Sequence, residues 1–225
     1  MNTKRRILPW KGLFAAAALM GVAAGAQAIT LSGSDVNYTF DENNLGLYAG
    51  SYAVTGNTLG FTPTSFVNNG VNPLVSQTMV ITVTPIAGQQ FSSLSFLESG
   101  TYTEQNSNDV AVSGQLRILN PLTTSELTPP IPNPDFSVPG TNQTWQASIN
   151  QDISSFYNAS SLTITIQDLL INTGSLASIN KNLLKLTITT SPVPEVETWT
   201  MMLAGVGLIA LQLRRRTGSN AREIR

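Results

Sequence analysis

Short runs of alternating apolar and polar residues set narrow limits on the fold of this chain. The clearest runs cover residues 78–84, 110–119, 162–167 and 184–189, and the positions between their apolar residues carry mostly Thr, Ser, Gln or Lys. Because a strand directs successive side chains to opposite faces, each run predicts a strand with one buried face and one solvated face. This pattern is typical of antiparallel sheets that cover one side of a core.

Weaker alternating runs raise the predicted number of strands to about nine. They cover residues 36–40, 51–54, 58–61, 94–97 and 144–149. The chain is therefore expected to be all-β, with an antiparallel two-sheet sandwich of jelly-roll or immunoglobulin-like type over residues 29–190.

Turn-forming residues separate these runs. Gly56-Asn57 lies between two of them and is typical of a tight hairpin turn. Residues 120–140 contain six prolines and predict a long surface loop, because proline cannot donate a hydrogen bond within a central strand. Residues 154–158 and 169–181 are the segments with room for short helices.

Missing residue types exclude several kinds of chemistry. The chain has no cysteine, so its core must hold the fold without disulfides, and it has no histidine, the commonest general base and transition-metal ligand. We therefore expect no cofactor. Residues 29–194 contain three basic and ten acidic residues. An acidic region of this kind is unsuited to phosphate contacts, which excludes nucleic acid as its partner.

The remaining polar residues give only weak candidates for an active site. Glu98 could pair with Glu104 or Asp109 as the acid and base of a glycosidase, but solvated acids are the simpler interpretation. A serine nucleophile would need Lys181 or Lys185, and both are expected to be solubilising charges beside a strand. The sequence predicts no catalytic residue.

Two further groups of residues have a binding interpretation and a structural one. Residues 41–44 and 106–109 carry the oxygen ligands that calcium prefers, although Asp and Asn also form turns, and no metal site is predicted. Aromatic residues could stack on sugars, but aromatics at alternating positions are more often part of a core. These aromatics are Tyr38, Tyr48, Tyr52, Tyr102 and Trp145.

The first 28 residues have the three parts of a secretory signal peptide. Basic residues at positions 4–6 precede an apolar stretch over residues 13–24, and Ala26-Gln27-Ala28 follows. Signal peptidase recognises small residues such as Ala26 and Ala28, so we expect cleavage after Ala28. The mature chain would then begin at Ile29 outside the cytoplasm.

Residues 191–216 combine a linker, an apolar run and a basic cluster. The apolar run covers residues 198–213 and predicts a short transmembrane helix, with the arginines and the tail 217–225 on the cytoplasmic side. A buried core helix is the alternative, but core helices seldom end in three arginines. The residues that define this segment are Val193, Pro194, Glu195, Trp199, Arg214, Arg215 and Arg216.

This arrangement resembles the PEP-CTERM protein-sorting signal. In that family a Pro-Glu-Pro motif precedes a transmembrane helix and a basic cluster, and a membrane-embedded exosortase processes the signal in Gram-negative bacteria that make exopolysaccharide. Val196 occupies the position of the family's second proline. The resemblance implies an exosortase as partner, an inner-membrane-anchored precursor, and delivery to the cell surface or extracellular matrix.

The sequence is compatible with more than one class of function. The first hypothesis is an exported, non-catalytic surface or matrix protein associated with exopolysaccharide or biofilm. The alternative is a carbohydrate-binding module, and a secreted hydrolase is a more distant third. Polysaccharide binding by residues 29–194 would separate the first two.

Overall fold

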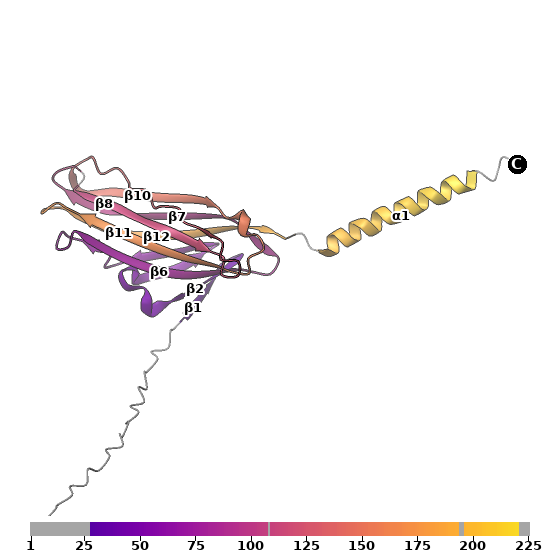
Figure 1. Cartoon of the computed structure of the whole chain (residues 1–225), viewed down its shortest axis with the longest axis horizontal. Coiled ribbons are helices and arrows are strands. Elements are labelled where there is room, and N and C mark those ends of the chain that lie inside the picture. Colours follow the sequence, from indigo (N-terminus) through magenta and orange to yellow (C-terminus); the bar gives the residue numbers. More distant parts are fainter. Residues whose placement is uncertain (1–27, 108, 194–195, 221–225) are drawn as a thin grey trace, which may run out of the picture.

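A computed structural model describes residues 28–107, 109–193 and 196–220, with side chains described up to residue 193 and again over 200–212. Residues 1–27 of the predicted signal peptide, including Ala26, lie outside the described residues, as do Pro194 and Glu195. The strands extend from Ala28 to Pro192 and form two antiparallel sheets that face each other (Figure 1). The predicted antiparallel two-sheet sandwich is therefore confirmed in a mostly β chain, and its jelly-roll or immunoglobulin-like type stays a prediction.

The first sheet has six strands, each antiparallel to its neighbours. In spatial order they are β1 (Ala28–Ser32), β2 (Val36–Asp41), β6 (Leu74–Pro85), β11 (Leu162–Asn172), β8 (Val110–Leu119) and β9 (Glu126–Leu127).

The second sheet is built around two long central strands. Its spatial order is β10 (Gly140–Asp152), β7 (Gln89–Glu104), β12 (Ser178–Pro192), β4 (Thr58–Pro63) and β3 (Gly50–Thr55), and the short β5 (Val67–Asn68) pairs with the start of β12. Three single-turn 3₁₀ helices lie in the connections: η1 (Glu42–Asn44), η2 (Gly46–Tyr48) and η3 (Ser154–Phe156).

The core lies between the inner faces of the two sheets. Ile164 and Ile166 of β11 face inward from the first sheet, and Leu184 and Leu186 of β12 face inward from the second; all four are fully buried. Burying a side chain of this size contributes about 1.5–3 kcal/mol. Each alternating run forms a strand because this conformation buries all of its apolar side chains on the inner face of the sheet and leaves its polar side chains on the outer face.

All nine predicted strands are present, together with three short strands that the sequence did not predict, β1, β5 and β9. The predicted hairpin at Gly56 is confirmed, with φ +58° at that glycine between β3 and β4. The possible helix over residues 169–181 is wrong. Its first part completes β11 and its last part begins β12, because sheet pairing with β6, β8 and β7 satisfies their backbone groups.

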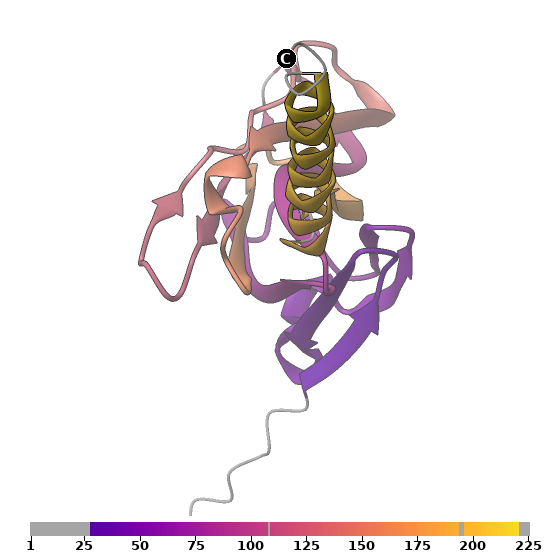
Figure 2. The same cartoon turned by 90° about the vertical axis from the view of Figure 1, so that its right-hand side faces the viewer.

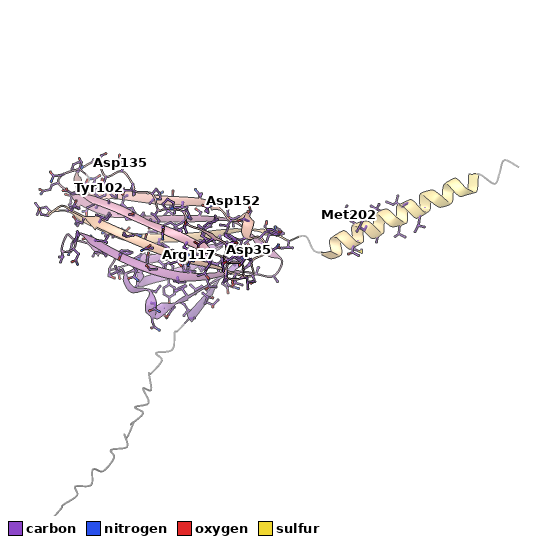
Figure 3. All side chains as sticks on the ribbon, viewed as in Figure 1. Asp35, Tyr102, Arg117, Asp135, Asp152 and Met202 are labelled. Carbon is purple, nitrogen blue, oxygen red and sulfur yellow. The ribbon has the colours of Figure 1, made fainter. Side chains whose placement is uncertain are left out.

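The C-terminal segment forms one helix, α1 (Val196–Asn220). The side chains of Met201, Met202 and Leu203 are exposed. Figure 1 shows α1 extending away from the sandwich, Figure 2 shows the molecule from the side on which α1 lies, and Figure 3 shows Met202 on α1 away from the sheets. Among the described residues, no helix has both the length and the hydropathy needed to cross a bilayer. The transmembrane helix predicted over residues 198–213 is thus not found; that run falls short of the roughly 20 apolar residues that a span requires.

Candidate functional site

The outer face of the second sheet carries small polar side chains in rows that cross the strands. One row consists of Thr55, Thr58, Thr187, Ser95 and Asn150, and each residue is the cross-strand partner of the next. Inward-facing apolar residues flank these positions along most of the strands, so the row follows directly from the two-residue period of the sequence. The row crosses all five long strands of the sheet.

A groove opens beside this row because the neighbouring row has small residues. Ala53 pairs with Gly60, and Gly60 pairs with Lys185. A groove of about 540 Å³ passes over Gly60, which has no side chain to occupy it. Its walls are formed by Thr55, Thr58 and Thr187 from the polar row and by Ser51, Thr62 and Leu183.

Gly60 is not required by the backbone at this position. A Cβ there would lie 3.9 Å from the carbonyl oxygen of Ala53 and 4.0 Å from that of Leu184, which are ordinary contact distances. The absence of a side chain at Gly60 therefore shapes the outer surface and does not relieve a clash.

The groove offers mostly neutral hydrogen-bonding groups. The hydroxyls of Thr58 and Thr187 lie 2.8 Å apart, and the exposed Lys185 supplies the charged group in the lining. Tyr52 lies at one edge, where its ring packs edge-on against Phe40 at 5.3 Å and its hydroxyl donates to Glu42 at 2.6 Å. A hydroxyl both donates and accepts hydrogen bonds, so this surface suits a neutral, hydroxyl-rich ligand.

The aromatic residues considered as sugar-stacking groups lie mainly in the core. Tyr38, Tyr48, Tyr102 and Trp145 are buried, and only Tyr52 is partly exposed. Tyr102 lies at the end of the sandwich near Asp135, and its hydroxyl donates to the Val138 carbonyl at 3.0 Å (Figure 3). The core interpretation of these alternating aromatics is thus confirmed for four of the five.

A second site lies inside the sandwich, where Lys181, Glu98 and Asp168 meet. Lys181 is on β12, Glu98 on the adjacent β7 and Asp168 on β11 of the facing sheet, and all three side chains are fully buried. Lys181 Nζ donates to Glu98 Oε2 and to Asp168 Oδ2. The hydroxyl of Tyr48 donates to the same Asp168 oxygen at 2.5 Å.

A β-bulge places Lys181 in the core. The register of β12 against β7 shifts between Lys181 and Leu183. Ile179 and Lys181 face inward before the bulge and Leu184 faces inward after it, so the inward positions change from odd to even numbers. The prediction that Lys181 is a solubilising charge is therefore wrong, whereas Lys185 is exposed as predicted.

The protonation of this cluster follows from its burial. Burial raises the pKa of Glu98 to about 8; the Lys181 charge opposes this increase and the Asp168 charge adds to it. Glu98 is then neutral at pH 7, and Lys181 and Asp168 form a balanced ion pair. Burial also raises the pKa of Tyr48 well above its usual value, so its hydroxyl remains a donor.

The cluster leaves two buried oxygens without hydrogen bonds. Within the described residues, Glu98 Oε1 and Asp168 Oδ1 have no partner. A buried carboxyl oxygen without a partner costs free energy, since its hydration is lost and not replaced. The burial of these three polar side chains is therefore not explained by a gain in packing stability alone.

The glycosidase pairs considered from the sequence are not brought together. Glu98 contacts Lys181, while the buried Glu104 accepts a hydrogen bond from the backbone N–H of Asp109 at 3.0 Å. Six residues along one strand separate the two glutamates by about 20 Å. Glycosidase carboxyl pairs lie about 5–9.5 Å apart.

The acidic turns considered for calcium have structural roles. Asp41 caps η1, accepting the backbone N–H of Asn43 at 3.0 Å and the side-chain amide of Asn44 at 2.5 Å. Asp109 accepts the Asn106 side-chain amide at 3.4 Å. The described residues contain no group of three or more Asp, Glu, His or Cys side chains placed to hold a metal ion.

The residues of the two predicted sorting segments are only partly described. Ala28 is exposed at the start of β1, and the backbone N–H of Val193 donates to the Gly88 carbonyl at 2.8 Å. Trp199 and Arg214, Arg215 and Arg216 belong to α1, but their side chains lie outside the described residues.

Comparison with known proteins gives no family assignment. No family model matches the chain, and no curated protein matches it.

Several solved structures are distantly similar to it. CBM22-1–GH10 modules of an endo-1,4-beta-D-xylanase from Clostridium thermocellum share 11% identity at a TM-score of 0.29, over 58% of this chain and 27% of that one. CBM35 from Cellvibrio japonicus shares 17% sequence identity at a TM-score of 0.25, and the match covers 75% of this chain and 94% of that one. An endoglucanase from Rhodothermus marinus shares 11% sequence identity at a TM-score of 0.31, and the match covers 75% of this chain and 97% of that one. Similarities at these TM-scores establish neither a shared activity nor a shared ligand.

Proposed function

We propose that this protein is an exported, non-catalytic polysaccharide-binding protein of the cell surface or extracellular matrix. The observation that carries the proposal is the groove at Gly60, beside a row of hydroxyl and amide side chains that crosses the second sheet. A polysaccharide would lie across the strands and along this row.

The chemistry of the face supports a neutral polysaccharide as ligand. Sugar hydroxyls donate and accept hydrogen bonds, and so do Thr, Ser and Asn side chains. The groove, at about 540 Å³, lies within the usual range of ligand pockets, about 300–1,000 Å³. Lys185 is the single charged residue in its lining, so highly charged ligands have few partners there.

The two ends of the chain support export and sorting. The three-part pattern that ends at Ala28 is typical of a signal peptide. The segment from Val193 to the arginine cluster resembles a PEP-CTERM signal, which implies processing by an exosortase. In this proposal, the processed protein joins an exopolysaccharide matrix, where its groove is occupied by a matrix polysaccharide.

Polysaccharide binding is tested with the mature chain and a panel of soluble polysaccharides in affinity electrophoresis. Gly60→Gln should obstruct the groove and weaken binding at least tenfold, because Gly60 has room for a side chain without displacing the backbone. The control is Thr165→Gln on the outer face of the other sheet, which should leave binding unchanged. No retardation by any polysaccharide, or equal retardation of both variants and the wild type, would reject the proposal.

Export and sorting are tested in the producing cell. The mature protein should begin at Ile29, as determined by N-terminal sequencing. A form shortened near residues 194–195 should appear in wild-type cells and disappear in cells that lack an exosortase. Full-length chain retained in the cytoplasm would contradict this part of the proposal.

A further inference from the structure

The buried cluster of Lys181, Asp168 and Glu98 has a chemical use that is independent of ligand binding on the outer face. The primary amine of Lys181 is in hydrogen-bond contact with the carboxyl groups of both Asp168 and Glu98. All three side chains are fully buried. These are the components needed to make an amide from an amine and a carboxylic acid.

We propose that Lys181 and Asp168 condense to form an intramolecular isopeptide bond between Nζ and Cγ, with Glu98 as the group that transfers protons. The bond would join β12 of the second sheet to β11 of the first. Only 13 residues separate its two ends in the sequence, but these ends lie on opposite layers of the sandwich.

The reaction begins with a proton transfer inside the ion pair. Lys181 Nζ gives a proton to the Asp168 carboxylate, which leaves a neutral amine and a carboxylic acid. Water normally opposes this transfer because it stabilises both charges. Burial of both side chains excludes this water, and Nζ is in direct hydrogen-bond contact with the carboxylate oxygen that receives the proton.

The amine lone pair then forms a bond to Asp168 Cγ. Glu98 accepts a proton from the nitrogen and returns a proton to one Asp168 oxygen, which leaves as water when its bond to Cγ breaks. One C–N bond forms, one C–O bond breaks, and no atom is oxidised or reduced. Glu98 ends in the protonated state in which it began.

The surroundings favour this step in three ways. Nζ is in hydrogen-bond contact with an oxygen attached to Cγ, so little motion is needed for attack. Tyr48 donates a hydrogen bond to the same oxygen and thereby fixes the carboxyl group. The rings of Phe66 and Tyr48, with centroids 5.0 Å and 5.9 Å from Nζ, help to exclude the water that would reverse the reaction.

The bond would give this chain a covalent link between its sheets. The chain has no cysteine and therefore no disulfide. An amide needs no oxidising compartment and is not broken by reductants. The reaction would also remove one oxygen of Asp168, whose Oδ1 is buried without a hydrogen-bond partner among the described residues.

Peptide mapping of the purified full chain tests the proposal. A protease that cleaves after leucine separates Asp168 from Lys181 at Leu169, Leu170 or Leu176. The wild type should give these two peptides joined, with a mass lower than their sum by one water. A lysine-specific protease should fail to cleave after Lys181. Two separate peptides with unmodified Asp168 and Lys181, or a dehydrated Asp168 peptide not joined to Lys181, would overturn the proposal.

Three variants test the role of each group. Glu98→Gln should remain folded and give separate peptides, whereas Glu104→Gln, which changes another buried glutamate on the same strand, should remain linked. Asp168→Asn should lose ammonia instead of water and give a linked product identical in mass to that of the wild type. A fully linked Glu98→Gln chain would overturn the role of Glu98, and an Asp168→Asn product that differs in mass from the wild-type product would overturn the site of the bond.

Discussion

Gly100 provides a sharp test of the packing around the second sheet, through the substitution Gly100→Ala. A Cβ at this position would lie 1.8 Å from the backbone oxygen of Asn180 and 2.7 Å from Nε1 of Trp145. The same carbonyl accepts the Trp145 indole N–H at 3.0 Å. The glycine therefore lets the β12 backbone approach β7 next to Lys181.

The expected cost has two parts. Forcing a methyl group into a packed site costs about 1–3 kcal/mol, and loss of the indole hydrogen bond adds about 1 kcal/mol. The free energy of unfolding should thus fall by about 2–4 kcal/mol, which for a chain of this size lowers the melting temperature by roughly 4–16 °C.

Gly60→Ala on β4 is the matched control for this substitution. Its new Cβ would make only ordinary contacts, at 3.9 Å and 4.0 Å. We expect a change within about 1 kcal/mol of the wild type, because reduced freedom of the unfolded chain offsets any small strain. Chemical denaturation followed by circular dichroism measures both variants. Equal stability of Gly100→Ala and Gly60→Ala would refute this account of the packing.

Three further predictions concern stability. Ile164→Ala should lower the free energy of unfolding by about 2–5 kcal/mol, since Ile164 is fully buried, and the neighbouring outward-facing Thr165→Ala should change it by less than about 0.5 kcal/mol, as denaturant midpoints would show. Because burial raises the pKa of Glu98 from 4.5 to about 8, the folded chain binds more protons between these pH values. With respect to Glu98 alone, the free energy of unfolding should therefore be greatest below about pH 4.5. It should fall by up to about 1.4 kcal/mol per pH unit between pH 4.5 and pH 8. A pH series of unfolding curves measures this slope, which Glu98→Gln should flatten. Arg117→Ala should cost less than about 1 kcal/mol, because its 2.7 Å ion pair with Glu126 is exposed, and a larger loss in thermal unfolding would contradict this estimate.

Much of the fold could be predicted from the sequence because burial on one face imposes a two-residue period. Residues 110–119 were predicted as a strand with the bounds that β8 has in the structure. The short strands β5 and β9 have only two residues each, too few for any period to appear. They exist because longer neighbouring strands offer them backbone partners.

The buried cluster could not be predicted because its placement depends on a bulge. Before the bulge Ile179 and Lys181 share the inward face, and after it Leu184 and Leu186 do. A constant period extended backward from Leu184 puts Lys181 outside. The alternation of Ile179 with Lys181 was the one local signal that Lys181 faces inward.

The groove was missed for a different reason. Gly60 lies within β4, where it pairs with Ala53 and Lys185. Which small residues lie beside one another depends on the register of three strands. The sequence of each strand alone does not determine that register.

Mapping of a bound polysaccharide by amide chemical shifts tests the proposed function most directly. The mature chain is labelled with ¹⁵N and titrated with a polysaccharide that binds in the affinity assay. The account predicts that the shifts cluster at Thr55, Thr58, Gly60, Lys185 and Thr187 and leave the outer face of β6, β11 and β8 unchanged. Shifts confined to that opposite face, or to the loops at the ends of the sandwich, would contradict it.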